Sequence, residues 1–248
     1  MRQEAYFCTV KELDELGKNN IPRQLISHTH LIYSSPATLA FNSPGAEGFG
    51  VKRAGLAVPD SVMLIVSPGC CGRNTSVLSS MRAYQDRFYY LLMDETDIVT
   101  GRHLKKIPKA VAEICEGLKK KPSVVMICIT CVDALLGTDM ERVCHKAEEY
   151  AGVPVRPCYM YALTREGRKP PMVHVRQSVY SLLEPKKKKG NVVNLLGYFS
   201  PLTDDCELYD LLHGAGVKTI HEISRCKDYA QYQTMSEANF NLVLHPEA

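Results

Sequence analysis

The most informative part of this sequence is SVMLIVSPGCCG, residues 61–72. Five of its first six residues are apolar, and the run ends at a Ser-Pro-Gly turn. A short, continuous apolar run that ends in this way is typical of a parallel β-strand buried on both faces. The stretch therefore predicts a strand over 61–66, followed by a loop that carries two adjacent cysteines.

Similar apolar runs recur along the next hundred residues and predict further strands over 88–93, 124–129 and 155–160. Apolar residues at helical spacing predict helices over 101–119, 132–150 and 172–183. Strands that alternate with helices of this length form right-handed βαβ crossovers and a parallel sheet. The sequence therefore predicts an α/β protein with a Rossmann-like sheet.

The pattern restarts after the tract EPKKKKG at 184–190. Strands are predicted near 192–199, 217–223 and 240–245, with a helix over 203–213 and a short helix near Ser236. The predicted organisation is an N-terminal extension over 1–30, a first Rossmann-like domain over 31–184, a basic linker over 185–190 and a partial second α/β domain over 191–248.

The last predicted strand reads as buried, yet the second unit has only three strands. Because helices cannot cover both faces of so small an open parallel sheet, such a unit is a poor place for a domain to end. We therefore expect either a truncated chain or a second polypeptide that completes the unit.

Composition argues against several classes of partner. The chain has 248 residues and a formal net charge of +3, from 30 basic and 27 acidic side chains, which gives no reason to expect nucleic-acid binding. Its longest apolar runs fall far short of the roughly 20 residues that span a bilayer, and its N-terminus offers no signal-peptide core. We therefore expect a cytoplasmic protein without a membrane partner.

The ten cysteines do not form a disulfide, zinc-finger or ferredoxin pattern, and most are predicted to be small buried residues. Cys70, Cys71 and Cys131 differ because each follows a predicted strand, and parallel strands meet at one edge of a sheet. A helix N-terminus lowers the pKa of a thiol, while Gly69 and Gly72 let the backbone approach a bulky group. These residues predict a metal or iron–sulfur site, with inert buried cysteines as the alternative.

Three motifs, in this order, resemble the nitrogenase component 1 superfamily. SPGCCG (67–72) resembles its Gly-Pro-x-x-Cys loop, and DIVTG (97–101) resembles its D-I-V-F-G-G segment. Thr130-Cys131, followed by GTD at 137–139, resembles its Thr-Cys helix start and the turn after it. The superfamily includes the large nitrogenase subunits, their cofactor-assembly scaffolds and the dark-operative protochlorophyllide reductase subunits. The chain resembles the N-terminal half of a member.

The resemblance implies that Cys71 and Cys131 ligate an iron–sulfur cluster, [4Fe-4S] or larger, at a subunit interface. Relatives supply another cysteine from an earlier glycine-rich loop, which here reads NSPGAEGFG (42–50) and has none. Cys70 is the predicted substitute, and a dimer with itself or a related subunit would bring the missing ligands. His245 stands near the position of a cysteine in relatives with a molybdenum–iron cofactor, so that cofactor is not expected on these residues.

The leading functional prediction is a redox protein. It would accept electrons from an ATP-dependent iron–sulfur reductase and pass them to a substrate that the sequence does not identify. One alternative is a non-catalytic scaffold that holds a cluster for transfer. The other is an α/β module that binds a small ligand and has inert cysteines. Asp94, Glu95 and Asp97 are spaced like paired carboxylates but are predicted to be structural.

Overall fold

The computed structural model describes residues 9–17, 19–20, 22, 50–69, 79–130, 136–159 and 171–245. The chain divides into two units, Met1–Leu39 and Ala40–Ala248. The described part of the first unit is centred on helix α1 (Val10–Leu16), which begins with a capping box. The Thr9 hydroxyl accepts from the backbone N–H of Glu12, and the Glu12 carboxylate accepts from that of Thr9.

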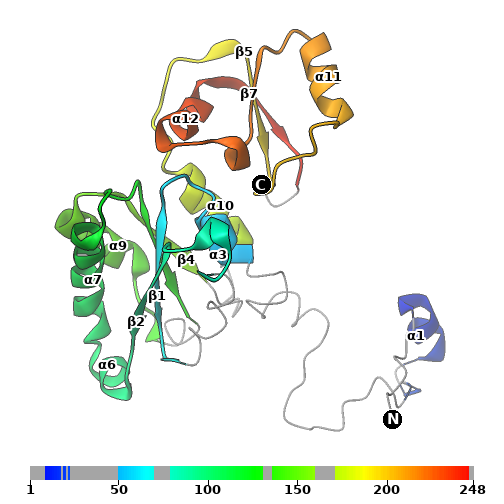
Figure 1. Ribbon diagram of the computed structural model, residues 1–248. Coiled ribbons are helices and arrows are strands. Elements are labelled where there is room, and N and C mark those ends of the chain that lie inside the picture. Colours follow the sequence, from blue (N-terminus) through cyan, green and yellow to red (C-terminus); the bar gives the residue numbers. More distant parts are fainter. Residues whose placement is uncertain are drawn as a thin grey trace. The chain divides into compact units, whose positions relative to one another are not determined.

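The second unit contains a four-stranded parallel sheet, the first sheet, shown in Figure 1. Its strands are β1 (Val62–Ser67), β2 (Phe88–Leu92), β3 (Val125–Ile129) and β4 (Val155–Tyr159). Their order is β2-β1-β3-β4, and every neighbouring pair is parallel. The predicted α/β class and the four predicted strands are therefore confirmed.

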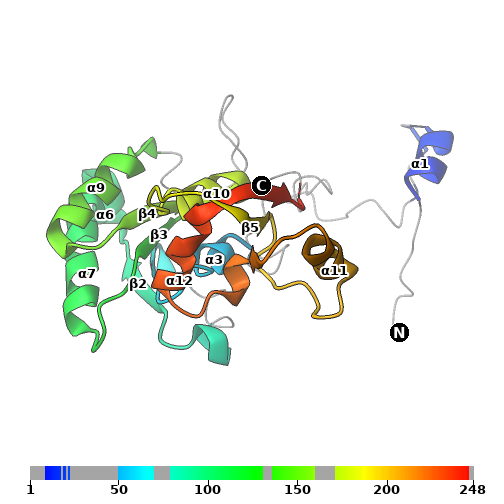
Figure 2. The same cartoon turned by 90° about the horizontal axis from the view of Figure 1, so that it is seen from above.

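Helices cover both faces of the first sheet, as Figure 2 shows from above. They are α3 (Gly50–Gly55), α6 (Glu95–Thr100), α7 (His103–Gly117), α9 (Met140–Ala151) and α10 (Pro171–Tyr180). One face packs against α7 and α9 through Ile107 and Ala147. The other packs against α3 and α10 through Ala54 and Val179. This coverage explains why every residue of β1 and β3 is buried.

A second parallel sheet follows, in the order β6-β5-β7. Its strands are β5 (Lys189–Leu196), β6 (Thr219–His221) and β7 (Ala238–Val243). Its helices are α11 (Glu207–Gly214) and α12 (Tyr229–Gln233), with the 3₁₀ turns η4 (Ile223–Arg225) and η5 (Thr234–Glu237). A further 3₁₀ turn, η3 (Arg82–Tyr84), lies between β1 and β2 in the chain. The three predicted strands are present, and β5 begins inside the segment predicted as a linker. The predicted domain boundaries stay a prediction.

The prediction that the last strand is buried is wrong. Phe240 and Val243 of β7 are 59% and 53% exposed. Among the described strands β7 pairs with β5 alone, and α11 buries none of its own residues. The apolar side chains of β7 therefore lie on a surface of the second sheet that the described residues cover only in part.

Contacts between α12 and the end of α10 connect the two sheets. Ile223, Tyr232 and Met235 belong to the same apolar core as Val179. The Tyr232 hydroxyl donates to the carbonyl of Val179, and the Gln233 amide donates to that of Leu182 at 2.7 Å. The segment that joins the two sheets, at the end of α10, is therefore hydrogen-bonded to α12. Within the described ranges, no helix is long and apolar enough to cross a membrane.

Candidate functional site

The strand order of the first sheet places a topological switch point between β1 and β3. The chain leaves β1 for β2 on one side and leaves β3 for β4 on the other. In open α/β sheets, ligands bind in the crevice at the carboxyl ends of the two strands where the order reverses. The sequence places its predicted cysteine loops directly after these two strands.

The structure tests only part of the predicted site. Cys70, Cys71, Gly72 and Cys131 lie outside the described residues, so their meeting at one point stays a prediction. Gly69 is described and exposed, and a Cβ built on it would have no atom of the described residues within 4 Å.

Two buried hydroxyls lie at the switch point. Ser67 ends β1 and is 0% exposed, and Thr130 follows β3 and is 1% exposed. Neither hydroxyl oxygen has a hydrogen-bond partner among the described residues. A buried hydroxyl without a partner costs about 1–3 kcal/mol of folding free energy, so native proteins keep few of them. Two at one place make this end of the sheet a candidate contact for a bound group, although other buried hydroxyls, those of Tyr180 and Ser224, also lack a partner among the described residues.

These two side chains are neighbours on the same face of the sheet. Val66 is the register partner of Ile129, so the next residues, Ser67 and Thr130, are adjacent across the strands. Side chains alternate along a strand, and both hydroxyls fall on the α3 and α10 side, with Ile65 in that core. The sequence analysis missed the pair, because the polar ends of two apolar runs become a site only once the register is known.

The same face carries a buried cation and two buried thiols. Lys52 of α3 is 1% exposed. Cys128 and Cys158 are register partners on β3 and β4 and are both 0% exposed. The positive charge of Lys52 is close enough to Cys158 to lower its pKa slightly, against larger opposing effects. The two helices that cover this face, α3 and α10, therefore each carry a buried cation, Lys52 and Arg176.

Five of the six described cysteines pack into or against the apolar cores: Cys115, Cys128, Cys144, Cys158 and Cys226. The hydrogen bond with the Cys128 thiol, together with burial, holds the pKa of Cys158 well above its ordinary value. Burial raises the pKa of Cys144 to about 12 and that of Cys226 to about 11, and it also raises the pKa of Cys115. Since the thiolate is the form that binds a metal, these residues are poor ligands. The prediction that Cys115, Cys128 and Cys144 are packing residues is supported.

The carboxylates of Asp94 and Asp97 hold helices together. Asp94 and Asp97 form a capping box at the start of α6. The Asp97 carboxylate lies 2.6 Å from Lys106 Nζ and 3.1 Å from Arg102 Nε. The hydrogen bond from Lys106 is the main cause that lowers the pKa of Asp97. Asp97 therefore joins α6 to α7 as an anion, which agrees with its predicted structural role.

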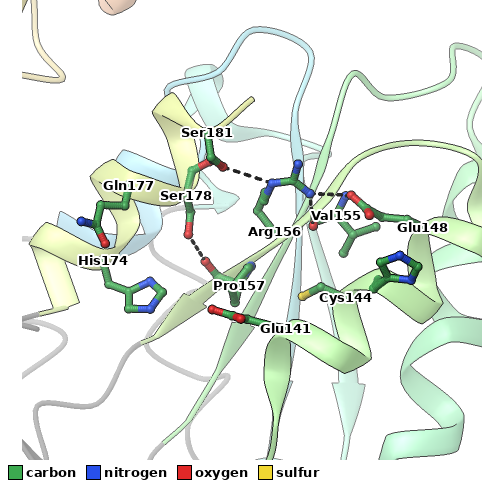
Figure 3. Close-up of a pocket in the computed structure, with 11 residues that line it drawn as sticks. Glu141, Cys144, Glu148, Val155, Arg156, Pro157, His174, Gln177, Ser178 and Ser181 are labelled. Carbon is green, nitrogen blue, oxygen red and sulfur yellow. Dashed lines mark hydrogen bonds and ion pairs between the residues drawn. The ribbon is translucent and has the colours of Figure 1, made fainter. Parts of the chain in front are cut away.

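A cavity of about 380 Å³ lies beside β4, between α9 and α10, as Figure 3 shows. It is bounded by a network that closes the outer edge of β4. The Val155 N–H donates to Glu148, the Arg156 guanidinium donates to Glu148 and Ser181, and the Ser178 hydroxyl donates to the carbonyl of Pro157. Because these groups already satisfy one another, the network favours protection of a sheet edge over ligand binding.

The described residues do not form a metal site by themselves. Among them, no three His, Cys, Asp or Glu side chains gather closely enough to hold a metal ion. The paired hydroxyls of Ser67 and Thr130 nevertheless fit the rim of an inorganic group with acceptor atoms, such as the sulfides of an iron–sulfur cluster. Any such group depends on ligands from the cysteine loops.

Comparison with known families gives one broad match. The family model described as nitrogenase component 1 type oxidoreductase matches residues 47–248. This range includes the first sheet, the switch point and the second sheet.

Curated relatives carry names from cofactor assembly. The nitrogenase iron-molybdenum cofactor biosynthesis protein NifE of Rhizobium meliloti (strain 1021) is 28% identical, and the match covers 68% of this chain and 37% of that protein. NifE of Klebsiella pneumoniae is 26% identical, over 81% of this chain and 48% of that protein. The chain thus spans less than half the length of these relatives.

Solved structures support the fold. The structure titled "Nitrogenase Cp1 at pH 6.5" aligns with a TM-score of 0.54 at 21% identity, over 77% of this chain and 40% of that one. A second structure of the same protein, at pH 5, aligns with a TM-score of 0.53 at 22% identity. The arrangement of the two parallel sheets is therefore one that occurs in nitrogenase.

Proposed function

Because the chain belongs to the nitrogenase component 1 type oxidoreductase family, we propose that it acts in a scaffold that holds a metal–sulfur cluster for cofactor assembly. The observation that carries this proposal is the match to relatives named as iron-molybdenum cofactor biosynthesis proteins. It favours the scaffold alternative of the sequence analysis over the electron-accepting redox protein that was its leading prediction.

The residues proposed to hold the cluster are Cys70, Cys71 and Cys131. Thiolates bind iron in such clusters, which normally need four ligands. A second subunit, either another copy or a related chain, would therefore supply the remainder. A bound cluster would provide iron and sulfide for transfer. Free thiols of this kind persist in a reducing compartment, so we also propose that the protein is cytoplasmic.

Metal analysis of anaerobically purified protein tests the cluster. We expect stoichiometric iron and acid-labile sulfide in the wild type and their loss in a Cys71→Ala, Cys131→Ala double variant. Cys206→Ser is the matched control, because Cys206 is only partly buried and precedes α11 in the second sheet. This control should keep both iron and sulfide. Iron absent from the wild type, even after reconstitution, would refute the proposal.

Transfer separates a scaffold from a redox enzyme. A scaffold should lose its iron to a cluster-free acceptor protein of the same family when the two are mixed and then separated. A redox enzyme should keep its iron and be reduced repeatedly by an ATP-dependent iron–sulfur reductase. Retained iron with repeated ATP-dependent reduction would reverse our choice between the two.

A further inference from the structure

We propose that the hydroxyls of Ser67 and Thr130 are hydrogen-bond donors to a sulfur atom of the bound cluster, and that they set its reduction potential. This inference rests on the proposed function, because it requires a cluster at the switch point. It assigns the two hydroxyls a positioning role beside the cysteine ligands.

The first argument is the position of the two side chains. They directly follow the two apolar runs on either side of the switch point, and the β1–β3 register makes them neighbours. Adjacent parallel strands are about 4.8 Å apart, so both hydroxyls can reach one bound group. That group would lie beyond the carboxyl ends of the strands.

The second argument is their missing partners. Both residues are at least 99% buried, and neither hydroxyl is satisfied within the part of the chain that the structure describes. Some buried hydroxyls are satisfied: Ser178, for example, donates to the carbonyl of Pro157 at 2.8 Å. Others among the described residues, such as those of Tyr180 and Ser224, also lack a partner. Ser67 and Thr130 are distinguished by being neighbours at the point where this sheet topology binds ligands.

The third argument is charge. A cluster held by thiolates is anionic, and the face that carries both hydroxyls also carries the buried cation of Lys52. Two hydroxyl donors match a negatively charged group that can accept hydrogen bonds. A buried water molecule between the hydroxyls is the structural alternative, since water needs two or more polar partners.

A hydrogen bond to cluster sulfur stabilises the reduced state, which carries the additional negative charge. Hydrogen bonds to the sulfurs are among the factors that set cluster potentials. We therefore expect Ser67→Ala and Thr130→Val to make the potential more negative. A tenfold weaker reduction equilibrium corresponds to about 59 mV for a one-electron couple, and we expect a shift on the order of this size from each variant.

The test measures three quantities on the full chain, purified anaerobically and reconstituted with iron and sulfide. They are the iron and sulfide content, the reduction potential from a titration followed by electron paramagnetic resonance, and the melting temperature of the cluster-free protein. We expect both variants to bind iron, to have a more negative potential and to keep or raise the melting temperature when cluster-free. Ser178→Ala is the control, which should lose thermal stability without a shift in potential.

The outcomes separate the two proposals. Wild-type protein without iron would refute the proposed function and this inference together. Wild-type protein with a cluster whose potential is unchanged in both variants would overturn the role of the hydroxyls and leave the scaffold proposal in place. Variants whose cluster-free form melts at a lower temperature than the wild type, and whose reconstituted cluster has an unchanged potential, would show that the hydroxyls serve only the fold.

Discussion

The two parallel sheets differ in how completely their faces are covered. Every residue of β1 and β3 in the first sheet is buried, whereas β7 in the second sheet buries only Ala238 fully. The first sheet has helices on both faces, and α11 of the second sheet buries none of its own residues. The difference shows that helices on both faces, rather than the apolar strands alone, are what bury the first sheet.

The outer edge of the first sheet is protected, whereas the outer strand of the second sheet exposes apolar side chains. On β4, side chains satisfy the outward backbone groups of Val155 and Pro157, and proline offers no N–H for another strand. On β7, Phe240 and Val243 lie exposed. The β4 edge is therefore closed to further pairing, while the apolar surface around β7 is open.

The largest effect is expected in the first sheet. Ile127→Ala removes a side chain that is 0% exposed at the centre of β3. We expect the free energy of unfolding to fall by about 2–5 kcal/mol, because a cavity forms where helices on both faces prevent collapse. Urea denaturation of the cluster-free protein measures this loss. A loss below about 1 kcal/mol would mean that the first sheet is as loosely packed as the second.

The second largest effect is expected where β5 ends. Gly197 has a φ of 118°, and a Cβ there would lie 2.6 Å from His245 Cβ and 2.8 Å from its backbone nitrogen. We expect Gly197→Ala to cost about 2–3 kcal/mol, since it combines backbone strain with a steric clash.

Gly190→Ala is the control for this prediction, because Gly190 lies on β5, the strand that Gly197 follows, and no atom of the described residues is within 4 Å of its Cβ position. It should change the unfolding free energy by less than about 1 kcal/mol. Equal effects of the two variants in urea denaturation would show that the end of the second sheet is not closely packed.

A smaller effect tests the connection between the sheets. Tyr232→Phe removes the hydroxyl that donates to the Val179 carbonyl, which keeps only the longer hydrogen bond from the backbone N–H of Leu182 at 3.3 Å. We expect a loss of about 1–2 kcal/mol, whereas Tyr150→Phe, at a 53% exposed position, should have no measurable effect. Calorimetry should show one transition in each protein. A separate early transition in the wild type would contradict a shared core.

The smallest effect is expected at the open face. Phe240→Ser changes a side chain that is 59% exposed, so the unfolding free energy should change by about 0.5 kcal/mol or less. Self-association in sedimentation experiments should decrease, because exposed apolar surface is lost. A loss above about 2 kcal/mol would show that another chain or segment covers β7 in solution.

Much of the fold was predictable because its signals are local. The apolar runs at 61–66 and 124–129 became β1 and β3 within one residue, since short continuous runs between turns have few other solutions. The paired Asp94 and Asp97 were correctly predicted to be structural. The prediction that the last strand is buried was wrong, because an apolar pattern shows which side chains a strand could bury. It does not show whether another strand or helix packs against them.

The sequence by itself determined the α/β class, the order of the elements and the family, because periodicity and motifs are properties of consecutive residues. The assignment of the cysteines as ligands rests on the sequence alone and stays a prediction. The tertiary structure alone decided the order β2-β1-β3-β4 and the register that places Ser67 beside Thr130. The physical reason is that strand neighbours and burial depend on contacts between residues far apart in the chain, which no local pattern encodes.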